Sequence, residues 1–118
     1  MSGSGLIPLF AYGTLRHPRV QRATFGRLLD GRADTLAGYR LAPLAIHDSA
    51  VVELSGLAVH SAAQPTGDPN DRISGTLLLV TRAELEAADR YEVTEMVRIE
   101  VRLQSGETAW VYVRADPG

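Results

Sequence analysis

Residues 73–92 read ISGTLLLVTRAELEAADRYE and join a strand pattern directly to a helix pattern. The first part, Ile73–Val80, is a β-prone and largely apolar run, which predicts a strand. Thr81 is followed three positions later by Glu84, the spacing of a capping box that opens a helix. The stretch therefore predicts a helix from about Arg82 to Tyr91 and a domain that combines strands with helices.

Strand patterns flank this unit on both sides. After it, Val97–Leu103 alternates apolar and charged residues, which is the period of a strand with one buried face. A turn at 104–107 separates this run from Ala109–Val113, so we expect a hairpin. Before it, we expect strands at Leu6–Tyr12, Thr35–Leu41 and Ala50–Leu54, the last continued by residues 57–60, a short helix within Pro18–Leu29, and a loop over Ser61–Asp71.

These elements predict one α+β domain over residues 6–118, built on a small mixed β-barrel or curved sheet with flanking helices. Residues 1–5, MSGSG, are expected to form a flexible N-terminal arm. A chain of 118 residues is long enough to bury roughly two thirds of its unfolded surface. We therefore expect it to fold without a metal ion or a disulfide.

Composition argues against several classes of function. The formal net charge is −2 and the arginines are scattered rather than gathered in a stripe, so we expect no nucleic-acid partner. No apolar run approaches the roughly 20 residues that cross a bilayer, and no signal peptide is recognisable, so we expect no membrane association. The chain has no cysteine, which excludes disulfides and a thiolate nucleophile and is compatible with the cytoplasm, where we expect the protein to act.

Glu92 falls on the same helical face as Leu85, because seven steps of about 100° bring the two residues within about 20° of each other. Burial on this face would raise the pKa of the Glu92 carboxyl, and the group would then both take and return a proton. The alternative is a helix that frays after Arg90 and leaves Glu92 in a solvated loop. Periodicity alone leaves both interpretations open.

The first predicted strand ends at Tyr12, and the residues from Tyr12 to Arg16 read YGTLR. Gly13 would let the chain turn sharply with a positive φ and direct successive N–H groups at an anion. Thr14 adds a hydroxyl group, and Arg16 adds a positive charge suited to a carboxylate. An ordinary exit from a strand into a loop has the same sequence, so the residues alone leave a ligand cradle as one of two interpretations.

Four segments taken together resemble the γ-glutamylcyclotransferase-like family, also called the AIG2-like family. They are YGTLR at 12–16, LAGYRL at 36–41, SGTLLLV at 74–80 and ADRYEV at 88–93, and they occur in the order and spacing of the family. The resemblance implies a small mixed β-barrel with flanking helices. This expectation agrees with the strand-rich pattern of the chain.

The resemblance also implies a site made from distant segments. Its substrate-binding residues, which act largely through backbone amides, would be Tyr12, Gly13, Thr14 and Leu15, with Tyr112 of the last strand near the pocket. Its catalytic acid would be Glu92, the glutamate of the family's leucine-aspartate-x-x-glutamate-glycine pattern.

The chain departs from the family pattern at three positions. Ala88 replaces the usual leucine, Val93 the usual glycine, and Met96 a common tyrosine, while Arg98 is kept. Val93 and Met96 would flank the site, so these departures bear on substrate identity more than on the fold.

The resemblance implies a cyclotransferase that acts on a small γ-glutamyl amine, amino acid or peptide and needs no metal, nucleotide or organic cofactor. The α-amino group would attack the γ-carbonyl of the same molecule and release 5-oxoproline and an amine, while Glu92 moves the protons. The alternatives are a related acyl-transfer or amine-lyase activity on another amide, and a non-catalytic binding module of the same fold. The histidines, His17, His47 and His60, lack metal-ligand spacing and are expected at the surface.

Overall fold

The structure is a computed structural model that describes residues 5–92 and 95–115. Within these residues it contains seven strands, three α-helices and one 3-10 helix. In chain order the elements are β1 (Ile7–Ala11), η1 (Thr14–Arg16), α1 (Pro18–Phe25), β2 (Gly31–Ala37), β3 (Tyr39–Ala45), α2 (Ser49–Ser55), β4 (Val59–Pro65), β5 (Arg72–Val80), α3 (Arg82–Tyr91), β6 (Met96–Arg102) and β7 (Thr108–Arg114).

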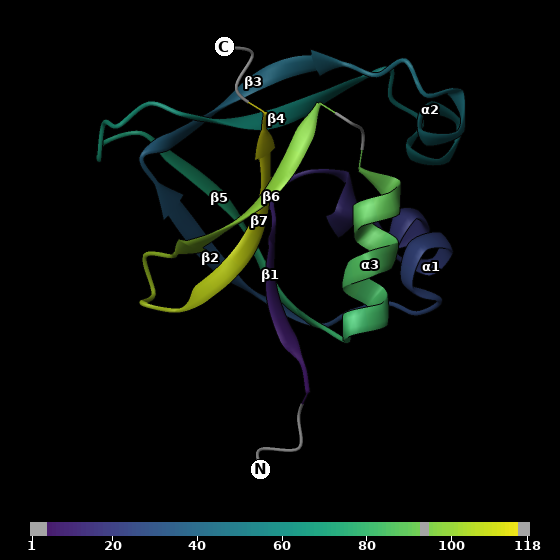
Figure 1. The fold of residues 1–118 in the computed structure, drawn as a ribbon, viewed down its shortest axis with the longest axis horizontal. Coiled ribbons are helices and arrows are strands. Elements are labelled where there is room, and N and C mark those ends of the chain that lie inside the picture. Colours follow the sequence, from purple (N-terminus) through teal and green to yellow (C-terminus); the bar gives the residue numbers. More distant parts are fainter. Residues whose placement is uncertain (1–4, 93–94, 116–118) are drawn as a thin grey trace.

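The strands form one sheet that curls into a half-barrel (Figure 1). Their hydrogen-bonded order is β2-β5-β1-β7-β4-β3, and β6 pairs with β7 outside this path. Most neighbours are antiparallel, whereas β1 and β4 both run parallel to β7. The helices lie together on one side of the sheet, with α3 beside α1 (Figure 1). The predicted α+β class with a curved sheet is confirmed.

One edge of β7 is divided between two partners. β6 pairs with the other edge along the whole of β7. On the divided edge, β1 pairs only as far as Phe10 with Val111, and β4 pairs at Ala63 with Val113. The end of β1 therefore leaves β7, and β4 takes its place.

Tyr12 bridges this point of division. Its hydroxyl donates to the Tyr112 carbonyl at 2.6 Å and accepts from the Ala63 N–H at 2.8 Å. The residue is buried, and burial raises the pKa of the hydroxyl above its ordinary value, so the group stays protonated. Because buried backbone groups need partners, the hydroxyl supplies the hydrogen bonds that β1 no longer makes.

β1 is buried on both faces, as its apolar run predicts. Leu9 and Ala11 pack in a core cluster that also holds buried residues of all three helices. Phe10 and Tyr12 point the other way and pack in a second cluster that consists almost entirely of strand residues. β1 therefore runs between the two clusters and carries its C-terminal end into the interior.

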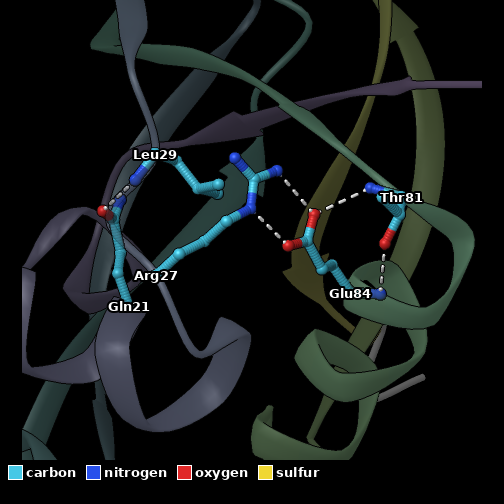
Figure 2. Close-up of polar contacts among 5 residues, drawn as sticks. All are labelled: Gln21, Arg27, Leu29, Thr81 and Glu84. Atoms are coloured by element: carbon cyan, nitrogen blue, oxygen red, sulfur yellow. Dashed lines mark hydrogen bonds and ion pairs between the residues drawn. The ribbon is translucent and has the colours of Figure 1, made fainter. Parts of the chain in front are cut away.

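α3 begins at the predicted capping box. Thr81 Oγ1 accepts from the Glu84 N–H at 3.1 Å, and the Glu84 carboxylate accepts from the Thr81 N–H at 2.9 Å. The same carboxylate accepts two hydrogen bonds from Arg27, at 2.7 and 3.0 Å (Figure 2). The helix predicted at Arg82–Tyr91 is confirmed in type and bounds, and the ion pair connects its first turn to the segment after α1.

The strand predicted at Ala50–Leu54 is wrong, because this segment lies in α2. The Asp48 carboxylate caps the helix by accepting from the N–H groups of Ala50 and Val51. Gly56 ends the helix in the left-handed conformation with φ 76°. Caps at both ends outweigh the modest β-preference of the valines.

Two other predicted bounds differ from the structure. The strand expected at Thr35–Leu41 is two strands, β2 and β3, because Gly38 has φ 86° and turns the chain between them. The loop expected at Ser61–Asp71 is shorter, because β4 continues to Pro65 in its pairing with β3. The short helix expected within Pro18–Leu29 is confirmed as α1, which spans Pro18–Phe25.

Of the arm predicted at residues 1–5, residues 1–4 lie outside the described part of the chain, and the domain bounds stay a prediction. Within the described part, none of the helices has both the length and the apolar character that a bilayer crossing requires.

The Tyr12 bridge predicts a stability effect. Tyr12→Phe is expected to lower the free energy of unfolding by about 1–3 kcal/mol, because the buried Ala63 N–H and Tyr112 carbonyl lose their partner. Urea denaturation followed by circular dichroism measures the change. Tyr39→Phe is the matched control, since the half-buried Tyr39 makes no hydroxyl hydrogen bond within the described residues. Equal losses in both variants would contradict the bridging role.

Candidate active site

A cavity lies beside the division of the sheet. Its wall contains residues from the end of β1 and the turn after it, from β3 and β4, from the end of α3, and from β6 and β7. Its empty space is about 440 Å³, part of it open to solvent. All the residues to which the sequence assigns a role line this cavity: Tyr12, Gly13, Thr14, Leu15, Glu92 and Tyr112.

The turn after β1 offers three successive N–H groups. Gly13 has a φ of −121°, so the positive φ expected from the sequence is wrong. The chain instead enters η1, where the Gly13 carbonyl accepts from the Arg16 N–H at 3.1 Å. Among the described residues, nothing accepts from the N–H groups of Gly13, Thr14 and Leu15, which are therefore available to a ligand.

Two side chains hold this turn in place. The Gln21 amide donates to the Leu15 carbonyl at 3.0 Å, and its oxygen accepts from the Leu29 N–H at 3.0 Å (Figure 2). On the other side, Thr14 Oγ1 lies 2.7 Å from the Tyr91 hydroxyl. Since Tyr91 is the last residue of α3, this hydrogen bond sets the position of the turn relative to the helix end.

Glu92 follows α3 directly and is half-buried in the wall of the cavity. The Glu92 N–H donates to the Ala88 carbonyl at 3.0 Å, so the helix does not fray after Arg90. Burial and, secondly, the charge of Asp89 raise the pKa of the Glu92 carboxyl to about 7. Within the described residues no donor is hydrogen-bonded to this carboxyl. Near neutral pH both of its protonation states are therefore populated, which suits a group that exchanges protons.

Asp89 connects the end of α3 to β6 and β7. Its carboxylate accepts from Arg98 at 2.8 and 2.9 Å and from the Tyr112 hydroxyl at 2.6 Å. Arg98 also lies over the Trp110 ring, 4.5 Å from its centroid. Burial would raise the pKa of Asp89, but the hydrogen bonds from Arg98 and Tyr112 outweigh it and hold this pKa below its ordinary value. Asp89 therefore stays ionised beside Glu92.

His60 is expected at the surface but lines the cavity, so this expectation is wrong. Its Nε2 lies 2.9 Å from the Ser55 hydroxyl, and burial lowers the pKa of the imidazole below its ordinary value. Met96, one of the departures from the family pattern, also lines the cavity, whereas Val93 lies outside the described residues. Across the ranges 5–92 and 95–115, no group of three or more His, Cys, Asp or Glu side chains could hold a metal ion.

The sequence profile of one family matches nearly the whole chain. The family is described as Gamma-glutamyl cyclotransferase, AIG2-like, and the match covers residues 9–118. The chain belongs to this family. The match includes both the turn after β1 and Glu92, so the AIG2-like family resemblance carried by short segments is confirmed over the full domain.

Solved structures share the fold at low sequence identity. A solution structure from Arabidopsis thaliana has a TM-score of 0.72 and 23% identity, over 98% of this chain and 75% of that one. A human protein has a TM-score of 0.72 and 17% identity, over 96% of this chain and 69% of that one. A structure of a gamma-glutamyl cyclotransferase has a TM-score of 0.72 and 16% identity, over 93% of this chain and 67% of that one.

The related structures are longer than this chain. The chain spans 67–75% of the length of these three proteins, and at such identities the likeness shows the fold alone. No curated protein matches the chain. Family membership therefore rests on the AIG2-like profile.

Sequence patterns do not predict all the residues that form or support the cavity. Asp89 belongs to the AIG2-like pattern, so a signal was present, but the pattern alone does not say that its carboxylate meets Tyr112. Asp89 lies outside the cavity wall, whereas Leu44, Ile46 and His60 line the cavity, and no local pattern marks these three residues. They reach it because β3 pairs with β4 and β4 pairs with β7.

The raised pKa of Glu92 predicts a pH-dependent stability. Between the ordinary pKa of 4.5 and about 7, the folded state binds more protons than the unfolded state, so the free energy of unfolding falls as pH rises through this window. Glu92→Gln should remove this dependence and be more stable than wild type at pH about 8, by about 1–3 kcal/mol. Urea denaturation at several pH values measures both quantities. A stability difference that is constant with pH would contradict the burial of this carboxyl.

The charge of Asp89 predicts a second effect. Asp89→Asn should lower the pKa of Glu92 below about 7 but leave it above 4.5, because burial is the larger cause of the shift. Carbon-13 NMR titration of the Glu92 carboxyl measures this value. Glu86→Gln, at an exposed acid of the same helix, should leave it unchanged. An unchanged or higher pKa in Asp89→Asn would show that Asp89 does not act on Glu92.

Proposed function

We propose that the protein is a γ-glutamylcyclotransferase that releases 5-oxoproline from a small γ-glutamyl amine, amino acid or peptide. The observation that carries the proposal is a carboxyl with a pKa of about 7 in the same cavity as a turn with three available N–H groups. Membership of the AIG2-like family supports it. The two features meet the two needs of the reaction, a proton carrier and donors for a negatively charged oxygen.

The substrate of this reaction carries its own nucleophile. Its α-amino nitrogen reaches its γ-carbonyl carbon by closing a five-membered ring, so the enzyme mainly holds the folded substrate and moves protons. In the proposed mechanism, ionised Glu92 takes a proton from the α-ammonium group, and the amine attacks the γ-carbonyl carbon. The bond from this carbon to the departing nitrogen then breaks, and Glu92 gives the proton to that nitrogen. The attacking nitrogen loses its second proton to solvent, and the released amine takes one up to leave as an ammonium ion. One amide replaces another, and the carboxylate is regenerated.

We assign the N–H groups of Gly13, Thr14 and Leu15 to the substrate α-carboxylate or to the oxyanion of the tetrahedral intermediate. A preorganised donor of this kind typically stabilises such an oxyanion by about 3 kcal/mol. The hydrogen bond between Thr14 and Tyr91 supports this assignment, because it holds the donors at a set distance from the residue that precedes Glu92.

Tyr12 and Tyr112 complete the proposed substrate site. Both hydroxyls are engaged within the protein, Tyr12 with backbone groups and Tyr112 with Asp89, so we assign their rings to the wall of the cavity. The proposed reaction consists of proton transfers around one amide exchange, so it needs no metal or organic cofactor. We also propose that the enzyme acts in the cytoplasm, an environment compatible with a chain that has no cysteine.

A second candidate is a related acyl-transfer or amine-lyase activity on another amide in the same cavity. Met96 favours it, because a thioether lines the cavity where many family members have a tyrosine. This exchange removes a hydroxyl donor and alters the contacts offered to a substrate. A non-catalytic binding module, the third candidate, has no need for a buried carboxyl that destabilises the fold above pH about 7.

The proposal predicts the effect of Glu92→Gln. Release of 5-oxoproline from a panel of γ-glutamyl compounds should fall by at least about 100-fold, because the amide keeps the shape of the side chain but carries no proton. Wild-type kcat/KM should fall as pH drops through about 7, where Glu92 becomes protonated. Mass spectrometry of 5-oxoproline measures both.

Glu53→Gln, at an exposed acid of α2, is the matched control and should retain wild-type activity. Equal release by wild type and Glu92→Gln would contradict the role of Glu92. No release from any γ-glutamyl compound would overturn the cyclotransferase proposal and leave the other two candidates.

A further inference from the structure

An open groove adjoins the cavity on the side of η1 and β4. The groove shares part of its wall with the cavity, including Gly13 and His60, and its own wall adds Arg16, Leu57 and Val59. The shared residues place the groove next to the cavity, where a group attached to a substrate would reach it by passing Gly13. A second groove leaves the cavity on the side of Glu92 and Trp110.

The groove beside η1 carries a positive charge without an acidic neighbour. Arg16 donates to the Tyr12 carbonyl at 2.7 Å, which holds the guanidinium at the rim. No carboxylate of the described residues forms an ion pair with it, and no acidic side chain lines the groove. A carboxylate on a bound molecule would meet an uncompensated cation here, whereas a cationic group would be repelled.

The same groove has an apolar side. Leu57 and Val59 line it, and they are 50% and 54% exposed. An aliphatic group placed against them would remove apolar surface from water.

The second groove lacks these properties. Its guanidinium belongs to Arg98, which donates twice to Asp89 and stacks on Trp110. This cation is already compensated, so the second groove offers no charge to a carboxylate. Its wall adds one exposed aliphatic residue, Val97, at 43% exposure.

We propose that the groove beside η1 binds the departing half of the substrate, and that Arg16, Leu57 and Val59 select an amine that carries both a carboxylate and an aliphatic side chain. This inference rests on the proposed cyclotransferase function and assigns its specificity. The γ-glutamyl half occupies the cavity beside Glu92, and the departing half extends past Gly13 and His60.

The first test compares three substrates that differ only in the departing half. They are γ-glutamyl-leucine, γ-glutamyl-3-methylbutylamine, which lacks the carboxylate, and γ-glutamyl-putrescine, which carries a positive charge. We expect kcat/KM for 5-oxoproline release to fall in this order, by at least about tenfold between the first and the last. Equal values for the three, or the highest value for the putrescine compound, would overturn the specificity while leaving the cyclotransferase function intact. No 5-oxoproline from any compound would instead remove the function, and the inference with it.

The second test places a charge in each groove. Val59→Asp should lower kcat/KM for γ-glutamyl-leucine by at least about tenfold and narrow its advantage over the putrescine compound. Val97→Asp is the matched control in the other groove, at a similarly exposed valine of a strand, and should stay within about twofold of wild type. Val59→Lys loses the same apolar contact but adds a charge of favourable sign, so it should lower kcat/KM for γ-glutamyl-leucine less than Val59→Asp does. Equal losses in Val59→Asp and Val59→Lys, or a larger loss in Val97→Asp, would overturn the assignment of the groove.

Discussion

The structure depends on which groups form hydrogen bonds with the backbone at the point where β1 separates from β7. β1 and β4 share one edge of β7, and neither covers the point between them. The Tyr12 hydroxyl fills this point by bonding to the Tyr112 carbonyl and the Ala63 N–H. Since buried peptide groups without partners are costly, this bridge lets the sheet open without loss of hydrogen bonds. The opening is where the cavity lies.

Burial of the Glu92 carboxyl has two consequences with one cause. Loss of water around the carboxylate disfavours its charged form, which brings the pKa to about 7 and also lowers stability at high pH. Asp89 adds to this shift because Arg98 and Tyr112 keep it ionised. The same burial that suits Glu92 for proton transfer at neutral pH therefore also lowers the free energy of unfolding at that pH.

The sequence predicts well where a signal is local. The capping box at Thr81 and Glu84 defines the start of α3. Helical period places Glu92 on the face of Leu85 but leaves a frayed helix end open, and the hydrogen bond from the Glu92 N–H to the Ala88 carbonyl decides between the two. The sequence does not reliably predict secondary structure where a short apolar run has no clear hydrophobic period. The valines of α2 favour a strand by composition, although the cap at Asp48 and the glycine at position 56 are typical of the two ends of a helix. The expected positive φ of Gly13 was wrong for a related reason, because the conformation of that turn depends on η1.

The sequence by itself determined the α+β class, the α3 helix and the AIG2-like segments, because propensity, capping and motif spacing act over a few residues. Only the tertiary structure decided how these segments meet and which other residues line the cavity. Tyr12 and Tyr112 lie 100 positions apart and meet through parallel pairing of β1 with β7. His60 enters the wall through strand pairing, and contacts with β6 and β7 keep Asp89 ionised beside Glu92. Such contacts depend on how distant strands satisfy each other's backbone groups, which no local pattern encodes.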